Sequence, residues 1–206
     1  MTARRVLIAN RGEIAVRVIR ACHELGLEAI AVHSAADAEA LHVQLADAAV
    51  GIGPAPAMRS YLSVDAVMAA AEESGADAVH PGYGFLSENA EFARRVAAAG
   101  LVWVGPRAEI IELMGDKAAA REAAAAAGVP LVRGTGILST PEDAARAAAD
   151  LGYPVLLKAA AGGGGRGIRL VDDEDGLAAA FAQAQREVGA AFGDSSLYME
   201  KALVGV

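Results

Sequence analysis

The chain has 206 residues, of which 54% are hydrophobic, and a formal net charge of −8 at pH 7. Much of the hydrophobic content is alanine, and no stretch approaches the roughly 20 apolar residues that cross a bilayer, so we do not expect a membrane protein. The acidic balance argues against a general nucleic-acid surface, because binding to nucleic acid depends on clustered lysine and arginine.

The start of the chain and its cysteine content indicate the cellular compartment. The first residues, MTARRVLIAN, lack the apolar core and small-residue cleavage site of an export signal. The single cysteine, Cys22, lies in a helical apolar stripe, which favours a packed, reduced thiol over a nucleophile. These features predict a cytoplasmic protein.

The first hundred residues alternate between short apolar runs and helical periodicity. Strands are predicted over 6–9, 29–33, 48–52, 78–80 and 101–104, and helices over 13–25, from the cap Ser63 to 74, and from the cap Asn89 to 99. Strands that alternate with helices predict an α/β domain with a mainly parallel sheet, covered by helices on both faces.

The pattern changes after Gly105-Pro106, where two helices, over 108–114 and 117–127, follow each other without a strand. We therefore predict two domains, of residues 1–115 and 116–206. In the second, Thr140 and Pro141 begin a helix that runs to about 150. Strands over 155–158 and 168–171, a helix over 174–188 and a strand over 197–199 follow.

The stretch VLLKAAAGGGGRGIRL, residues 155–170, places five glycines between two predicted strands. A loop that approaches phosphate groups needs bare backbone, because side chains would hold the ligand away. Arg166 and Lys158 add positive charge on either side. The alternative is a flexible hairpin tip that binds no ligand.

Two common phosphate-binding motifs do not fit this stretch. A P-loop needs a Lys-Ser or Lys-Thr pair and a helix after its glycines, and the dinucleotide fingerprint also opens a helix. Here the glycines lead into the strand-like IRLV. We therefore predict a lid between two antiparallel strands, which closes over a nucleotide and excludes water.

Four further segments are candidates for the same site. Lys117 begins a helix after Met114-Gly115-Asp116, although it is also consistent with an exposed surface lysine. Glu200 and Lys201 end a strand, which is consistent with an ordinary strand terminus. Residues 10–15, NRGEIA, follow the first strand, where parallel sheets carry ligand-binding turns, or form a simple helix cap. Residues 80–89, HPGYGFLSEN, form a long polar turn in which the histidine is functional or merely structural.

Taken together, these motifs resemble the biotin carboxylase family, the subunits or domains of acetyl-CoA, propionyl-CoA and pyruvate carboxylases. The segments that carry the resemblance are VLIANRGEIA (6–15), LHV (41–43), SYL (60–62), HPGYGFLSEN (80–89), MGDK (114–117) and KAAAGGGGRG (158–167). They cover essentially the whole chain, in order. The resemblance implies a Rossmann-like domain that precedes an ATP-grasp domain, of which only the small, lid-bearing lobe is present.

The resemblance also implies an activity and its cofactors. ATP activates bicarbonate to carboxyphosphate, with Mg²⁺, and the carboxyl group passes to biotin held on a carrier protein. The implied partners are this biotin carboxyl carrier protein, a carboxyltransferase subunit and a second copy of the enzyme.

Residue by residue, the resemblance implies that Lys117 and Lys158 contact the ATP phosphates. It also implies that Glu200 and Lys201 lie where the adenine binds. The lid comprises Gly163, Gly164, Gly165, Arg166 and Gly167, while Tyr83 and Glu88 line the active-site side of the first domain. The family's magnesium-binding glutamates, and its base and arginine for bicarbonate and biotin, are expected beyond Val206. We therefore expect no catalytic or metal-binding residue within the chain, and an inactive N-terminal fragment.

Two other interpretations remain open from the residues. One is another ATP-grasp carboxylate ligase, although HPGYGFLSEN followed by GDK favours biotin carboxylase. The other is a non-catalytic module that binds a nucleotide or a partner subunit. The sequence does not identify the acyl-CoA or keto acid that the parent system carboxylates.

Overall fold

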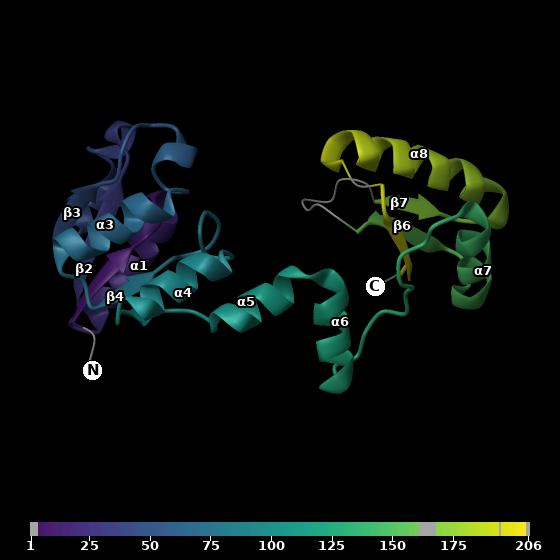
Figure 1. The fold of residues 1–206 in the computed structure, drawn as a ribbon, viewed down its shortest axis with the longest axis horizontal. Coiled ribbons are helices and arrows are strands. Elements are labelled where there is room, and N and C mark those ends of the chain that lie inside the picture. Colours follow the sequence, from purple (N-terminus) through teal and green to yellow (C-terminus); the bar gives the residue numbers. More distant parts are fainter. Residues whose placement is uncertain (1–3, 161–167, 194, 205–206) are drawn as a thin grey trace. The chain divides into compact units, whose positions relative to one another are not determined.

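The structure, a computed structural model, describes residues 4–160, 168–193 and 195–204, without the side chains of residues 117, 118, 191 and 192. The chain divides into two compact units, the first ending at Asp116 and the second beginning at Lys117. Figure 1 labels the main helices and strands of both units. Within the described residues, no helix combines the length and the apolar character needed to cross a bilayer.

The first unit contains a five-stranded sheet in the order β3-β2-β1-β4-β5. Its strands are β1 (Arg5–Ile8), β2 (Glu28–His33), β3 (Ala48–Gly51), β4 (Ala78–His80) and β5 (Val102–Trp103). Every neighbouring pair runs parallel. The predicted parallel α/β sheet is therefore confirmed, with all five expected strands present.

Helices cover both faces of this sheet (Figure 1). They are α1 (Gly12–Glu24), α2 (Leu41–Leu45), α3 (Val64–Ser74), α4 (Ala90–Ala98) and α5 (Ala108–Gly115), with short 3₁₀ turns at Ala35–Asp37 and Ala57–Arg59. Because strand side chains alternate between faces, Val6 and Ile8 pack with α1, while Leu7 and Ala9 pack with α3 and α4. Cys22 is a buried free thiol on α1, as predicted.

The helix caps predicted from the sequence are present. The Ser63 hydroxyl accepts a hydrogen bond from the Ala66 amide, and the Asn89 side chain accepts one from the Phe92 amide at 2.8 Å. These bonds satisfy amides that the first helical turn leaves without a backbone partner. Local capping chemistry therefore fixes where α3 and α4 begin.

The second unit contains a three-stranded antiparallel sheet in the order β7-β6-β8. Its elements are α6 (Lys117–Ala126), α7 (Pro141–Leu151), β6 (Val155–Ala159), β7 (Arg169–Val171), α8 (Glu174–Phe192) and β8 (Leu197–Lys201). Thr140 caps α7 and Pro141 occupies its first turn, as expected. The strands on either side of the glycine stretch are antiparallel, which confirms that part of the prediction.

Both α7 and α8 pack on one face of this small sheet. The buried side chains of β6, Val155, Leu157 and Ala159, lie in one apolar cluster with Phe181 of α8 and Ala144 of α7. Helix α8 continues four residues beyond the predicted end at 188 and stops at Gly193, whose left-handed φ of 73° suits glycine. Strand β8 likewise extends to Lys201 through its pairing with β6.

Candidate functional site

Asn10 holds the turn between β4 and α4 in place. It is fully buried, and its Nδ2 donates hydrogen bonds to the carbonyl oxygens of Pro81 at 2.8 Å and Tyr83 at 3.0 Å. Its Oδ1 accepts a hydrogen bond from the Arg11 amide at 2.9 Å. One side chain therefore joins the carboxyl end of β1 to the turn that follows β4.

Gly82 allows this turn to approach Asn10 closely. Its φ is +65°, and an added Cβ would lie 2.7 Å from Asn10 Nδ2 and 2.8 Å from Ile14 Cγ2. The Gly82 amide donates to Nδ1 of His80 at 3.0 Å, and burial lowers the pKa of His80. A neutral histidine that accepts this bond supports the turn, so the structure gives His80 a structural role.

The turn presents polar groups at the carboxyl edge of the parallel sheet. Tyr83 is 64% exposed, and its hydroxyl donates to Glu13 Oε1 at 3.0 Å, a bond that raises the pKa of Tyr83. Glu88 is exposed and directly precedes the cap Asn89. Tyr83 and Glu88 are thus accessible at the edge where parallel sheets bind ligands.

A buried polar network lies beside this turn. The Arg11 guanidinium donates to Asp37, with Nε to Oδ2 at 2.7 Å, and the Tyr61 hydroxyl donates to the same oxygen at 2.7 Å. The Ser34 hydroxyl adds a bond at 3.2 Å. Because these donors stabilise the carboxylate, they hold the pKa of Asp37 well below its usual range. Tyr61 also stacks on Phe85, with ring centroids 5.2 Å apart, which ties the network to the turn.

In the second unit, the sheet face opposite α7 and α8 carries the functional candidates. Side chains alternate along β6, so Lys158 and Leu156 point away from the buried cluster. Strand pairing places Tyr198 beside Lys158, and Glu200 and Leu170 on either side of Leu156. The face therefore combines apolar surface with one acidic and one basic group.

Lys158 and Glu200 form an ion pair on this face, between Nζ and Oε2. The second carboxylate oxygen of Glu200, Oε1, accepts a hydrogen bond from Nη1 of Arg121 on α6 at 2.9 Å. Arg121 also donates from Nη2 to the Val132 carbonyl at 2.7 Å. Glu200 is the most buried of the three ionic side chains, with 12% exposure, and it carries one cation on each oxygen.

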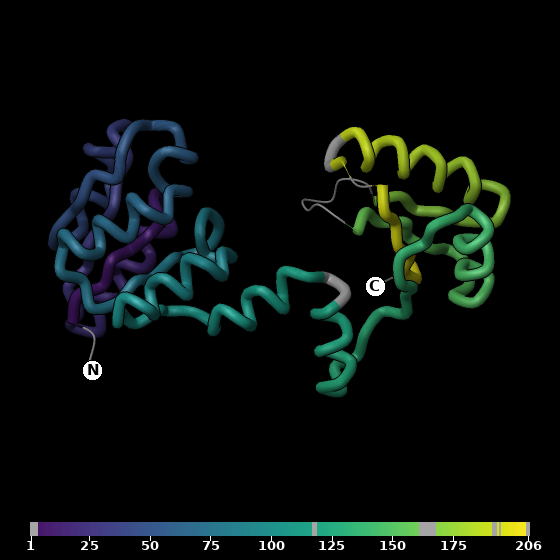
Figure 2. Tube along the Cα trace, in the orientation of Figure 1, coloured from purple at the N-terminus to yellow at the C-terminus, as the bar shows by residue number. Residues whose placement is uncertain are grey.

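The segment between α6 and α7 runs along the edge of β8 that does not pair with β6. Figure 2 shows it in green beside the yellow strand. The Thr135 amide donates to the Met199 carbonyl at 2.9 Å, and the Lys201 amide donates to the Arg133 carbonyl at 2.8 Å. At Gly134, an added Cβ would lie 2.9 Å from the Met199 oxygen and 3.2 Å from Arg121 Nη2. Glycine is therefore required for this close approach.

We predict that Gly134→Ala destabilises the second unit by about 1–3 kcal/mol, the usual cost of overpacking. The new methyl group meets backbone at β8 and the Arg121 side chain. Gly136→Ala is the matched control, because nothing lies within 4 Å of its Cβ position and it should be neutral or slightly stabilising. Urea unfolding followed by circular dichroism compares the two variants, and equal midpoints would contradict the prediction.

Lys201, Lys117 and the glycine stretch are the other residues that the sequence analysis assigned to nucleotide binding. The Lys201 side chain points to the opposite face from Glu200, where Nζ donates to the carbonyl oxygens of Gly152 at 2.9 Å and Tyr153 at 2.7 Å. Only the main chain of Lys201 is thus available beside Glu200. The Lys117 side chain and all of Gly163, Gly164, Gly165, Arg166 and Gly167 lie outside the described residues.

Arg121 was missed by the sequence analysis. It lies on an alanine-rich helix, 79 positions before Glu200, and no local motif marks it. Within the described residues, no group of three or more His, Cys, Asp or Glu side chains is placed to hold a metal ion. The described side chains of the site thus provide ionic contacts, and no step through Mg²⁺ is assigned to them.

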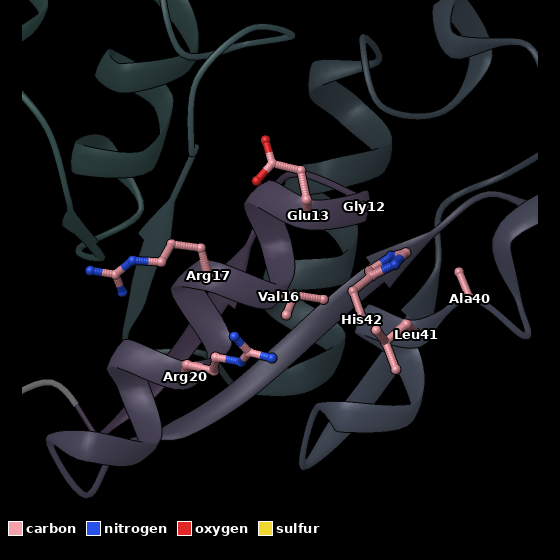
Figure 3. A pocket seen from close by; sticks show the side chains of 8 residues that line it. All are labelled: Gly12, Glu13, Val16, Arg17, Arg20, Ala40, Leu41 and His42. Carbon is pink, nitrogen blue, oxygen red and sulfur yellow. The ribbon is translucent and has the colours of Figure 1, made fainter.

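A hollow of about 420 Å³ lies between α1 and α2 in the first unit. Figure 3 shows the eight residues that line it, with Arg17 and Arg20 on α1 extending in opposite directions in this view and His42 on α2. His42 is buried, its Nε2 lies 3.2 Å from the Val32 carbonyl oxygen, and burial lowers its pKa. The lining includes none of the residues that the resemblance assigns to the nucleotide.

Comparisons with known proteins relate the chain to a family. Residues 2–111 match the family model described as biotin carboxylase, N-terminal domain, and residues 116–206 match the carbamoyl-phosphate synthase L chain, ATP binding domain. Biotin carboxylases of Pseudomonas aeruginosa and Haemophilus influenzae are 56% and 53% identical, each over 97% of this chain and 45% of the relative. The chain thus spans about half the length of the curated relatives it matches.

Solved structures show the same similarity. A biotin carboxylase from Campylobacter jejuni in a β,γ-ATP complex has a TM-score of 0.87 and 48% identity, over 98% of this chain and 46% of that one. The biotin carboxylase domain dimer of the Hydrogenobacter thermophilus 2-oxoglutarate carboxylase, solved with MgADP, ADP and bicarbonate, has a TM-score of 0.84 and 48% identity, over 99% and 45%. On its sequence and its fold, this chain belongs to the biotin carboxylase family.

Proposed function

We propose that this chain supplies the N-terminal part of an ATP-dependent biotin carboxylase, including one wall of its nucleotide site. The observation that carries the proposal is the ion-paired lysine on the open face of the β7-β6-β8 sheet, Lys158, beside the apolar side chains Leu156 and Leu170. An apolar surface with a nearby cation suits the base and the phosphates of a nucleotide. The family membership of the chain adds independent support.

The proposed chemistry begins with phosphoryl transfer. The terminal phosphoryl group of ATP passes to bicarbonate, giving ADP and carboxyphosphate, and the carboxyl group then passes to the ureido nitrogen of biotin with release of phosphate. Catalysis of phosphoryl transfer depends on positioning and on neutralisation of charge. Lys158 and Lys117 would supply that charge, while Gly163 to Gly167 would close over the phosphates and Glu200 with the Lys201 main chain would contact the adenine.

In the first unit, Tyr83 and Glu88 are proposed to line the active-site side of the domain. Tyr83 and Glu88 are exposed on the turn that Asn10 and Gly82 hold at the carboxyl edge of the sheet. The proposed partners are a biotin carboxyl carrier protein, a carboxyltransferase that selects the acyl-CoA or keto acid, and a second copy of the enzyme. The proposed location is the cytoplasm.

Nucleotide binding tests the proposal directly. We predict that Lys158→Met weakens the binding of ADP and ATP by roughly tenfold to a hundredfold, the usual contribution of a charge-assisted hydrogen bond. Isothermal titration calorimetry on the 206-residue chain measures both affinities. Arg146→Met is the control, because Arg146 forms a surface pair with Asp143 and is 79% exposed, so its loss should leave the affinity unchanged.

Two outcomes would contradict the proposal. Equal nucleotide affinity for the wild-type chain and Lys158→Met would remove Lys158 from the site. Absence of nucleotide binding combined with tight association with a carboxylase subunit would favour a non-catalytic module.

We also expect little bicarbonate- and biotin-dependent ATP cleavage by these 206 residues, because the family's metal-binding glutamates are expected in the part of the relatives that this chain does not span.

A further inference from the structure

Glu200 is shared by two cations that come from different parts of the second unit. Lys158 reaches it from β6 and pairs with Oε2, and Arg121 reaches it from α6 and pairs with Oε1. The carboxylate side chain is 12% exposed, whereas Lys158 and Arg121 are 24% and 31% exposed. The Lys158 side chain is therefore the more accessible member of a largely buried pair.

A phosphate group that takes the ammonium of Lys158 must compete with Glu200. If Lys158 were the only cation on that carboxylate, its departure would leave a buried charge without a partner, which is strongly unfavourable. The lysine would then stay on Glu200 and bind phosphate poorly. A second cation on the carboxylate removes this obstacle.

Arg121 is held in place independently of Lys158. Its Nη2 donates to the Val132 carbonyl at 2.7 Å, while its Nη1 contacts Glu200 at 2.9 Å. The 131–138 segment is itself bonded to β8, and Gly134 packs against both Arg121 and Glu200. Because the guanidinium is planar and presents several donors in a fixed arrangement, it keeps its contact with Glu200 when Lys158 leaves.

We propose that Arg121 is a positioning residue: by keeping Glu200 paired, it frees Lys158 to leave the carboxylate for a phosphate group. The identification of this phosphate group as part of a nucleotide rests on the proposed function. The exchange itself, in which Glu200 loses one of two cations, rests only on the contacts of Arg121, Glu200 and Lys158. Arg121 acts through Glu200 and needs no contact with the nucleotide.

Acylation of the lysines tests the exchange without any nucleotide. The chain has three lysines, Lys117, Lys158 and Lys201, so trace labelling with acetic anhydride and peptide mass spectrometry follows each one separately. Lys201 is the internal reference, because its ammonium is bonded to carbonyl groups on the other face of the sheet. The measured quantity is the rate of Lys158 labelling relative to Lys201.

We expect Arg121→Met to slow the relative labelling of Lys158 by roughly threefold to tenfold. Among the described residues, the Lys158 ammonium would then be the one cation left on Glu200, and the carboxylate would hold it more tightly. Arg121→Gln should give the same result, and its amide retains a donor for the Val132 carbonyl if the methionine variant folds poorly. Arg121→Lys restores a cation and should bring the rate back toward that of the wild type. Arg146→Met, a surface arginine of the same unit, should change nothing.

A double-mutant cycle separates action through Glu200 from a direct effect of charge. Glu200→Gln should speed the labelling of Lys158, and Arg121→Met added to it should have no further effect. An equal slowing by Arg121→Met in both backgrounds would overturn the proposal, and so would an unchanged rate in the single variant. ADP titration of the same four proteins is a separate test: if the wild type binds no ADP, the proposed function fails while the labelling still decides the role of Arg121.

Discussion

Replacement of Asn10 by alanine is expected to destabilise the first unit by about 2–4 kcal/mol. The side chain is fully buried and makes three hydrogen bonds, two of them to the carbonyl oxygens of Pro81 and Tyr83. Loss of a buried partner costs about 1–3 kcal/mol for each group left unsatisfied. The single tryptophan, Trp103, packs edge-on against Phe92 within this unit, so its fluorescence during urea unfolding reports the change.

The same variant should also release the turn that carries Tyr83. Hydrogen–deuterium exchange over residues 80–89 is expected to rise more than exchange over α3, because the two lost bonds belong to that turn. Asn10→Asp is the sharper variant, since it places carboxylate oxygens against two carbonyl oxygens, and it should destabilise at least as much.

Asn89→Ala is the control for Asn10, because it removes one cap bond on α4 and should cost only about 1 kcal/mol. If Asn10→Ala were no more harmful than Asn89→Ala, the turn would be held by other contacts. The hydrogen bonds of Asn10 would then be incidental to the position of Tyr83.

Much of this fold was predictable because its signals are local. Apolar runs placed all five strands of the first unit, and the caps Asn89 and Thr140 marked the first turns of α4 and α7. The short helix Leu41–Leu45 was not predicted, since it has five residues and no side-chain cap. It forms where His42 is buried against β2, and that burial is a tertiary contact that no local pattern contains.

The contacts among the candidate site residues could not be predicted from the sequence. The sequence analysis selected Lys158 and Glu200, yet their contact depends on the β6-β8 register, which pairs Leu156 with Glu200. Arg121 joins them from α6, 79 positions before Glu200, and no local pattern marks so distant a contact. The orientation of Lys201 was within reach, because neighbouring residues of a strand point to opposite faces and Glu200 and Lys201 cannot share one.

The stability of the first unit should depend on pH through Asp37. Its carboxylate accepts hydrogen bonds from Arg11, Tyr61 and Ser34, and these bonds hold the pKa of Asp37 below its usual value in the folded state. A lowered folded pKa means that the ionised form stabilises the fold. This contribution is complete above the unfolded pKa of about 3.9 and is lost as the pH falls toward the lower folded pKa.

Asp37→Asn removes the charge and the titration together. At pH 7 we expect a loss of about 2–4 kcal/mol, near the lower end of the range for breaking a buried pair, because the Arg11 side chain is 47% exposed. Urea midpoints from Trp103 fluorescence, measured between pH 7 and pH 3, give the difference between wild type and variant. That difference should be constant above about pH 5 and shrink below about pH 4 as the wild-type carboxylate takes up a proton.

Asp65→Asn is the matched control for Asp37. Asp65 pairs with Arg95 at 2.7 Å, but its side chain is 86% exposed, so the variant should lose less than about 1 kcal/mol at pH 7. His42 interacts electrostatically with Asp37, and it is present in both wild type and variant, so its own protonation largely cancels in the difference. A wild-type advantage that stayed constant down to pH 3 would show that Asp37 acts through shape and hydrogen bonding rather than through its charge.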